Sequence, residues 1–248
     1  DAQGRVSLDA LKEALCPETI LVSIMYVNNE VGTVQPVQEA VQIVKRYKPS
    51  VLFHTDAVQG FGKYSIYPKR IGIDLLTASG HKIHGPKGIG FLYIDSRVKI
   101  HPIVFGGEQQ RNIRSGTENV PGIAGIGLAA KMIYQDLDVK TALMRELKEY
   151  FIEGIKKIDH TVIHGITDEG GAPHIISVGF AGVRSEVLLH TLEDKGIYVS
   201  SGSACSSNHP AVSGVLKGIG APREYLDATL RFSMSEFTTK EEIDYTLE

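Results

Sequence analysis

The sequence predicts an α/β protein whose mainly parallel sheet is flanked by helices, followed by a smaller α+β domain at the C-terminal end. In the first half, short apolar runs alternate with segments of helical period, which is typical of a parallel sheet covered by helices. In the second half, a long amphipathic helix is followed by several strand candidates. We place the boundary near Asp136, which gives domains 1–136 and 137–248.

Composition narrows the class of protein. The formal charge is -3, with 42% hydrophobic and 22% charged residues, and no basic cluster suits nucleic acid or an anionic membrane surface. No apolar run approaches the length of a membrane span, and no signal peptide is recognisable, so we expect a cytoplasmic protein. The two cysteines are treated as thiols, and no metal site is predicted. The start at Asp1 and the short last helix suggest a piece of a longer chain.

The first domain is expected to alternate strands and helices. Pro17 and Pro49 each end a helical segment, and the run from Thr19 to Val27 is apolar enough for a strand buried on both faces. In chain order, we expect a helix over 7–15, strands over 19–27, 51–53 and 73–77 with a helix over 37–48 among them, an antiparallel strand over 88–94 and a helix over 120–134.

The second domain is expected to begin with a helix over 138–158. Strands are predicted over 175–180, 197–200 and 230–234, with a helix over 186–194 between the first two. Thr238 and Glu241 have the spacing of a capping box for a last helix. The glycine-rich, basic segment from Gly106 to Thr117 precedes the helix over 120–134, and its free amides and arginines suit an anion.

Lys82 is the first candidate for chemistry. It lies in the turn after the strand over 73–77, among small residues and histidines, where desolvation can produce the neutral amine that forms a Schiff base. Ligands gather at such strand ends in α/β sheets. Taken alone, however, a solvated surface lysine is the better interpretation.

Polar residues at other strand ends give Lys82 its context. A Schiff-base lysine requires an electron sink, which pyridoxal phosphate supplies when a carboxylate such as Asp56 keeps its ring nitrogen protonated. Gln59 and Asn29 are then placed for the ring oxygen, and three residues for the phosphate: Ser79, His81 and Thr117. Each also has a plainer interpretation: Asp56 as a cap, Asn29 as a turn residue, Ser79 as a helix start and Thr117 as an N-cap.

Six motifs together resemble the cysteine desulfurases of the NifS/IscS type, over essentially the whole chain. They occur in the family's order and near its spacing: Val27-Asn28-Asn29-Glu30-Val31-Gly32, His54-Thr55-Asp56-Ala57-Val58-Gln59, Ser79-Gly80-His81-Lys82, Arg114-Ser115-Gly116-Thr117, Ser201-Gly202-Ser203-Ala204-Cys205 and Leu230-Arg231-Phe232-Ser233. The resemblance implies a fold-type-I pyridoxal phosphate enzyme with an aspartate aminotransferase-like large domain.

The resemblance also implies roles for individual residues. Lys82 resembles the Schiff-base lysine that later moves the substrate's α-proton, and Asp56 the partner of the pyridine nitrogen. Arg231 resembles the guanidinium that binds the substrate carboxylate, with a strand-end salt bridge as the plainer alternative. Gln59 and Asn29 are implied as contacts to the phenolic oxygen, and Asn29 also as a contact to substrate. Ser79 and His81 are implied as phosphate contacts, with His81 also counted among the catalytic residues. Thr117 is implied as a contact to the phosphate of a neighbouring subunit, in a homodimer with shared sites.

Cys205 resembles the catalytic thiol that takes sulfur from L-cysteine as a persulfide, leaving L-alanine. Its surroundings, from Ser200 to His209, are small and polar, unlike the apolar pocket that makes a thiol inert. Cys16 is interpreted as a surface thiol without a role. The implied acceptor of the sulfur is an iron–sulfur scaffold or a tRNA-thiolation protein.

Three further interpretations of the chain stay open. Members of the family begin with a segment that supplies a histidine over the cofactor ring and a threonine for the phosphate. This sequence contains no counterpart of that segment, so the missing N-terminal segment is a further expected partner. The chain could therefore be a non-catalytic fragment for dimerisation or scaffold binding. It could also be a selenocysteine lyase, or an aminotransferase that releases no sulfur.

Overall fold

The computed structural model describes residues 1–202 and 213–248, which form two compact units. Unit 1 contains Asp1–Ser7, Val27–Pro36 and Asp138–Glu248, and unit 2 contains Leu8–Tyr26 and Val37–Leu137. In the described part of the chain, no helix is both long and apolar enough to cross a membrane.

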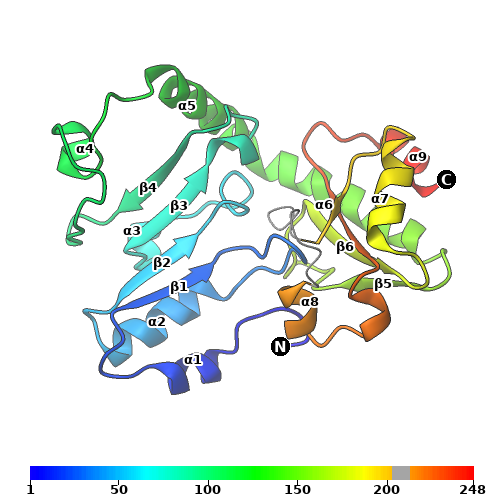
Figure 1. Ribbon diagram of the computed structural model, residues 1–248, viewed down its shortest axis with the longest axis horizontal. Coiled ribbons are helices and arrows are strands. Elements are labelled where there is room, and N and C mark those ends of the chain that lie inside the picture. Colours follow the sequence, from blue (N-terminus) through cyan, green and yellow to red (C-terminus); the bar gives the residue numbers. More distant parts are fainter. Residues whose placement is uncertain (203–212) are drawn as a thin grey trace. The chain divides into compact units, whose positions relative to one another are not determined.

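Unit 2 is built on a four-stranded sheet in the order β1-β2-β3-β4 (Figure 1). The first three strands are parallel and β4 is antiparallel to β3, which confirms the predicted mainly parallel sheet. The strands are β1 Leu21–Met25, β2 Leu52–Asp56, β3 Leu75–Ser79 and β4 Gly90–Ile94. Asp56 and Ser79 are thus the last residues of their strands, at one edge of the sheet.

One face of this sheet is covered by helices. Helix α2, Val37–Tyr47, buries Val41 and Val44 against Phe53 and Leu76, and α1, Leu8–Ala14, packs beside it. The other face is exposed at β1, where Leu21 and Ser23 alternate with partly buried residues; the expected burial of this strand on both faces is therefore wrong. Strands with one open face show this period of two.

The start of β2 is anchored by a buried carboxylate. Asp74 accepts hydrogen bonds from Lys45 Nζ at 2.5 Å and from the Phe53 N–H at 2.7 Å, and is 4% exposed. A buried charge needs such partners. The ion pair therefore fixes the end of the sheet opposite to Asp56.

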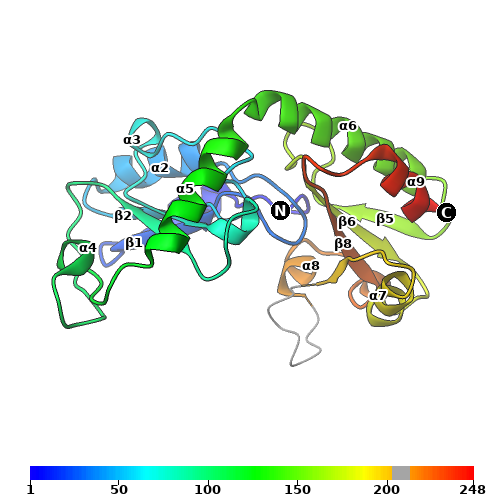
Figure 2. The same cartoon turned by 90° about the horizontal axis from the view of Figure 1, so that it is seen from above.

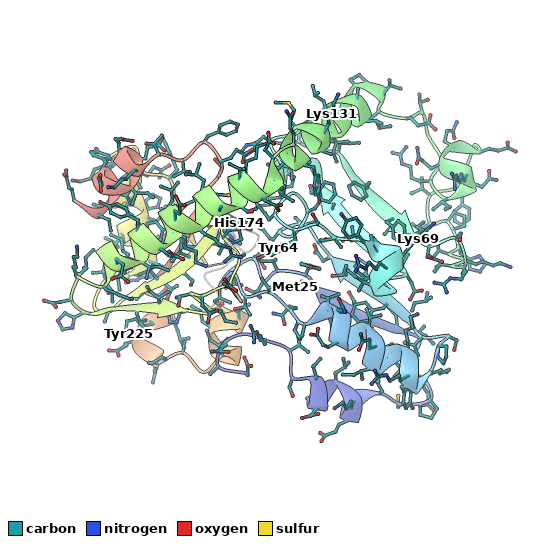
Figure 3. The ribbon with its side chains drawn as sticks, turned by 180° about the vertical axis from the view of Figure 1, so that it is seen from behind. Met25, Tyr64, Lys69, Lys131, His174 and Tyr225 are labelled. Carbon is teal, nitrogen blue, oxygen red and sulfur yellow. The ribbon has the colours of Figure 1, made fainter. Side chains whose placement is uncertain are left out.

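The rest of unit 2 follows β2 and β4. Figure 3 labels Lys69 in α3, Pro68–Ile71, and Lys131 in α5, Val120–Tyr134. Helix α5 packs Ile126 and Ile133 against Ile83 in a second small core. A short helix, α4 Gln109–Asn112, precedes it.

Unit 1 contains an antiparallel sheet in the order β5-β6-β8-β7. Helix α6, Leu137–Ile155, and helix α9, Lys240–Leu247, lie along one face (Figure 2), where Phe151 and Ile243 pack against Phe232. The strands are β5 Thr161–His164, β6 Ile175–Phe180, β7 Ser200–Ser201 and β8 Thr229–Ser233; the other helical segments are α7 Ser185–Glu193, α8 Gly214–Gly218 and η3 Arg223–Tyr225. This sheet and its helices confirm the expected smaller α+β part.

Two early segments cluster with unit 1 through hydrogen bonds. Thr33 Oγ1 donates to Gln3 O at 2.6 Å, and Gln35 Nε2 donates to Gly4 O at 2.7 Å. The Ala172 N–H donates to Gly32 O at 2.7 Å. The units therefore differ from a single division of the chain near residue 136, because residues 27–36 belong with the C-terminal residues.

Two local predictions are wrong in position. The capping box of α9 is formed by Thr239 and Glu242, one residue after the expected pair. The strand expected over 197–200 is observed as Ser200–Ser201.

Candidate active site

Asp56 lies at the end of β2 with an exposed side chain. Its strand partner in β3 is Thr77, and its carboxylate accepts one hydrogen bond, from the Val58 N–H at 2.9 Å. Gln59 follows, partly buried, in the next loop. Most of the Asp56 carboxylate is therefore available to a ligand at the carboxyl edge of the sheet, the usual ligand site of such folds.

Lys82 ends a short 3-10 helix, η1 Gly80–Lys82, directly after β3. The turn is held by its backbone: the Gly80 N–H donates to Ile89 O, and the Gly85 N–H donates to Gly80 O, both at 2.9 Å. A side chain at Gly85 would meet Gly80 O at 2.9 Å, which explains the glycine. The Lys82 side chain is exposed, so the enclosure expected around it is not provided by the described residues.

Ser79 and His81 are paired beside Lys82. Ser79 Oγ lies 2.7 Å from His81 Nδ1, and Ser79 is also the N-cap of η1 without a side-chain capping bond. Ser79, His81 and Lys82 therefore lie together at the end of β3, the strand that pairs with the strand of Asp56. A hydroxyl, an imidazole and an amine in one turn can donate to an anionic ligand.

A row of polar side chains behind Asp56 was not predicted. His54 Nδ1 lies 2.7 Å from Ser23 Oγ, and His54 Nε2 lies 3.3 Å from Thr77 Oγ1, so the row crosses β1, β2 and β3. Burial lowers the pKa of His54, and the Asp56 carboxylate opposes this effect. His54 is two residues before Asp56 and shares its face of the sheet, a signal that was readable in the sequence.

In unit 1, Asn29 and Arg231 are brought together. Arg231 Nη1 donates to Asn29 O at 2.9 Å, across 202 residues of sequence. The turn around Asn29 is closed by Asn28, whose Oδ1 accepts from the Glu30 N–H at 2.9 Å and from the Val31 N–H at 3.0 Å. The guanidinium is thus oriented by the turn, which suits the binding of a carboxylate.

Thr117 and Cys205 stand apart from these groups. Thr117 is exposed in the loop before α5, and the N-cap of that helix is Asn119, which accepts from the Gly122 N–H at 3.0 Å; Thr117 is not the cap. Cys205 lies outside the described residues, so its expected surroundings stay a prediction. Between Gly106 and Thr117, the loop is closed on itself by Ser115 and Gln109.

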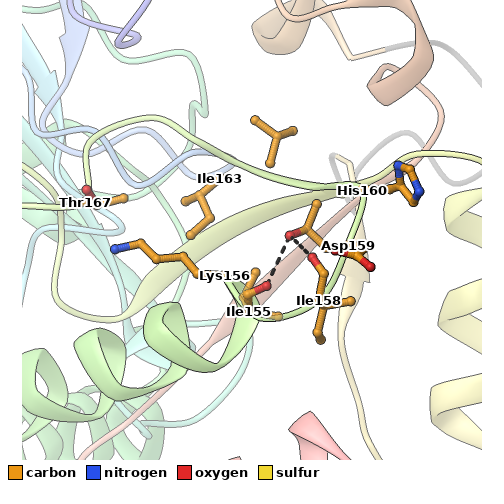
Figure 4. A pocket seen from close by; sticks show the side chains of 9 residues that line it. Ile155, Lys156, Ile158, Asp159, His160, Ile163 and Thr167 are labelled. Carbon is orange, nitrogen blue, oxygen red and sulfur yellow. Dashed lines mark hydrogen bonds between the residues drawn. The ribbon is translucent and has the colours of Figure 1, made fainter.

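A separate hollow in unit 1 contains none of the predicted site residues. It lies at the turn between α6 and β5 (Figure 4), where Thr161 Oγ1 donates to Ile155 O and Ile158 O at 3.1 and 2.9 Å. The Thr161 hydroxyl is therefore occupied by carbonyls of the chain itself. Within residues 1–202 and 213–248, no three His, Cys, Asp or Glu side chains are grouped as metal ligands.

Comparison with known proteins gives the family. The model of the class-V aminotransferases matches residues 1–246. The chain belongs to the class-V aminotransferase family. Enzymes of this class-V family depend on pyridoxal phosphate.

Individual class-V relatives cover the whole of this chain. The chain is 43% identical to cysteine desulfurase IscS of Dictyoglomus turgidum, covering 100% of itself and 62% of the relative. It is 41% identical to the mitochondrial cysteine desulfurase of Saccharomyces cerevisiae, covering 49% of that protein. A solved NifS-like protein has a TM-score of 0.92 and 37% identity, over 100% of this chain and 64% of that one. The chain therefore spans about three fifths of the length of several relatives.

The residues of unit 2 fit the family's cofactor by their chemistry. Asp56 offers an accessible carboxylate to a protonated ring nitrogen, and Lys82 an exposed amine to an aldehyde. The paired Ser79 and His81 offer donors to a phosphate. These groups therefore suit the ring nitrogen, the aldehyde and the phosphate of pyridoxal phosphate.

Proposed function

We propose that the protein is a cysteine desulfurase, which converts L-cysteine to L-alanine and transfers the sulfur to Cys205. The observation that carries the proposal is the common edge of β2 and β3, where Asp56 and the Lys82 turn end two adjacent parallel strands. The relatives named as cysteine desulfurases, at up to 43% identity over the whole chain, support it.

Each residue has a defined task in this proposal. Bound pyridoxal phosphate would act as the electron sink for the substrate's α-carbon. Lys82 would hold the cofactor's aldehyde and move the substrate's α-proton, and Asp56 would keep the ring nitrogen protonated. From the resemblance to the family, the ring oxygen is assigned to Gln59 and Asn29, the phosphate to Ser79 and His81, and the substrate carboxylate to Arg231. The Cys205 thiolate would attack the substrate sulfur, and the bond from that sulfur to Cβ would break with its electron pair going to the carbon that becomes the methyl group of alanine. The resulting persulfide would pass its outer sulfur to an acceptor protein.

Cofactor binding tests the proposal directly. Addition of pyridoxal phosphate to the pure chain should produce a visible absorbance band that Lys82→Ala abolishes and Asp56→Ala weakens or shifts. With L-cysteine, the loaded protein should form alanine and a persulfide on Cys205. A band indifferent to Lys82→Ala would contradict the Schiff base, and turnover that survives Cys205→Ala would favour an aminotransferase.

A second copy of the chain is the proposed partner at the loop before α5. Ile103 and Phe105 are 90% and 80% exposed there, and Gln110, Arg111 and Asn112 have positive φ angles, a costly conformation for three successive non-glycine residues. Contacts from a second copy would offset this cost and place Thr117 at the partner's phosphate. Sedimentation should show a dimer that Phe105→Ser weakens; an unchanged dimer would argue against this surface.

Further partners are proposed from the relatives. The segment that relatives carry beyond the matched three fifths would complete the cofactor site, so adding it as a separate polypeptide should tighten binding of pyridoxal phosphate. An iron–sulfur scaffold or a tRNA-thiolation protein is the proposed sulfur acceptor. A cytoplasmic location stays a prediction, since the relatives include mitochondrial proteins.

A further inference from the structure

Lys148 is a buried cation with no part in the proposed chemistry. It lies on α6, is 3% exposed, and donates from Nζ to Ala172 O at 2.8 Å. One turn earlier on the same helix, Arg145 Nη1 lies 3.4 Å from Gly171 O. Two cations of one helix therefore face two successive carbonyls of the loop that precedes β6. Burying an ammonium is expensive, so this arrangement requires a reason.

The loop held by these cations supports the turn that contains Asn29. On its other side, the Ala172 N–H donates to Gly32 O at 2.7 Å, and the Val34 N–H donates to Gly170 O at 3.2 Å. Thr33 and Gly171 form an isolated antiparallel bridge. Residues 170–172 are therefore placed between α6 and residues 32–34. His174, labelled in Figure 3, ends the loop just before β6.

The turn passes this constraint on to Arg231. The Gly32 N–H donates to Asn28 O at 3.0 Å, and the Asn28 N–H donates to Thr33 O at 2.9 Å, so residues 28–33 form one hydrogen-bonded turn. Asn29 O, within this turn, accepts from Arg231 Nη1. Hydrogen bonds thus connect Lys148 to Ala172, Ala172 to Gly32 and Gly32 to Asn28, and the next residue in the chain, Asn29, binds the guanidinium.

We propose that Lys148 is a positioning residue for the carboxylate-binding corner of unit 1, which it holds by fixing the loop against the turn that orients Arg231. The identity of the ligand, an α-amino acid carboxylate, rests on the proposed function. The placement of Arg231 rests on the contacts within unit 1 alone. Lys148 itself does not contact the substrate. Burial and then the Arg145 charge lower the pKa of Lys148, and Asp168 on the loop partly opposes them.

The test compares a methionine substitution at Lys148 on α6 with one at Lys156, the residue that follows this helix. Lys148→Met keeps the length and packing of the side chain but removes the donor and the charge. Lys156→Met is the matched control, because Lys156 is exposed at the end of the same helix and pairs with Glu153 at 2.6 Å. Arg145→Met removes the longer contact with Gly171 O and serves as the second variant if Lys148→Met fails to fold.

Amide hydrogen exchange measures the placement without any turnover. We expect Lys148→Met to accelerate exchange about tenfold at 28–34 and 170–172, with β5 and β6 unchanged, since only a local opening becomes easier. Arg145→Met should act at the same amides by about threefold, and Lys156→Met should not act there. Unchanged exchange at 28–34, or an equal rise across all of unit 1, would overturn the proposal.

Kinetics with the cofactor-loaded protein measure the consequence. Lys148→Met should raise the KM for L-cysteine about tenfold with kcat within about twofold, because a misplaced Arg231 weakens ground-state and transition-state binding alike. A fall in kcat at constant KM would contradict the positioning role. If the wild-type chain forms no alanine at all, the proposed function fails, whereas the exchange experiment still decides the role of Lys148.

Discussion

The two sheets differ in how they hold the polar groups of the proposed site. In unit 2, Asp56 ends β2 and Lys82 ends the short helix η1 after β3, and both side chains are exposed. In unit 1, the Arg231 guanidinium is already bound to Asn29 O and supported by a network of backbone bonds. The proposed carboxylate-binding corner is therefore preorganised within one unit, whereas the proposed cofactor-binding groups are presented to solvent in the other. Preorganisation lowers the cost of binding, so the corner should tolerate disturbance least.

In unit 2, the end of the sheet opposite to Asp56 is held by the buried ion pair of Asp74 and Lys45. Asp74→Asn removes the charge that pairs with Lys45 and weakens the acceptor for the Phe53 N–H, at a site that is 4% exposed. Breaking a buried pair in this way should cost about 3–5 kcal/mol of unfolding free energy. Urea unfolding with exchange of the β2 and β3 amides would measure the loss.

The control for this substitution is an exposed ion pair of the same unit. Asp9 and Lys12 lie 2.7 Å apart on α1, with side chains 84% and 56% exposed. Asp9→Asn should leave the urea midpoint unchanged, because solvent and salt screen such pairs. Equal losses from Asp74→Asn and Asp9→Asn would show that the buried anchor does not distinguish this end of the sheet.

Unit 1 should respond to pH through Lys148. Burial lowers the pKa of Lys148 from 10.5 to about 8, with Arg145 acting in the same direction and Asp168 against it. Between these values the unfolded chain binds the proton and the folded chain does not, so the unfolding free energy rises with pH. From about pH 7 to about pH 9.5 the gain is about 2 kcal/mol.

The variant Lys148→Met should lack this rise. Urea titrations of both proteins at the two pH values give the difference directly, and the other titrating groups cancel because they are common to both. If the difference in unfolding free energy between wild type and variant is the same at both pH values, Lys148 is charged at both, and the lowered pKa is wrong.

The sequence predicted regular elements better than it predicted their edges. The helices over 37–48 and 120–134 and the strand over 175–180 were found within a residue, since their apolar periods are strong. The capping box was displaced because Thr238-Thr239 and Glu241-Glu242 are doublets that satisfy the same pattern twice. Local pattern cannot choose between two such registers; the packing of α9 does.

Long-range contacts explain most of what was missed. The sequence pointed to Asn29 and Arg231 separately, through two motifs. Their hydrogen bond forms in a turn that also pairs, through Thr33, with Gly171 about 140 residues later in the chain, and local pattern does not reveal such a contact. Lys148 was not singled out, because a lysine within an amphipathic helix is normally exposed. Its burial follows from the loop over 165–174, which has no periodic pattern of its own.

A smaller effect on the unfolding free energy is expected at the capping box of α9 in unit 1. Thr239 Oγ1 accepts from the Glu242 N–H, and the Glu242 carboxylate accepts from the Thr239 N–H at 2.9 Å. Thr239→Ala should lower the unfolding free energy by about 1 kcal/mol, and Thr239→Ser should restore it. Calorimetry would show the loss, and equal stability of the alanine and serine variants would contradict the cap.

The smallest effect is expected at Cys16, the exposed thiol of unit 2. Its Sγ lies 3.4 Å from Thr19 Oγ1 after the end of α1, on a surface turn that does not contain the strand-end residues of the proposed site. Cys16→Ser keeps a group that can share this hydrogen bond, so the unfolding free energy should change by less than about 0.5 kcal/mol. Peptide mass spectrometry after reaction with L-cysteine should find the persulfide sulfur on Cys205 in both proteins. If the sulfur is found on Cys16 instead, and is absent from the serine variant, Cys205 is not the thiol that accepts it.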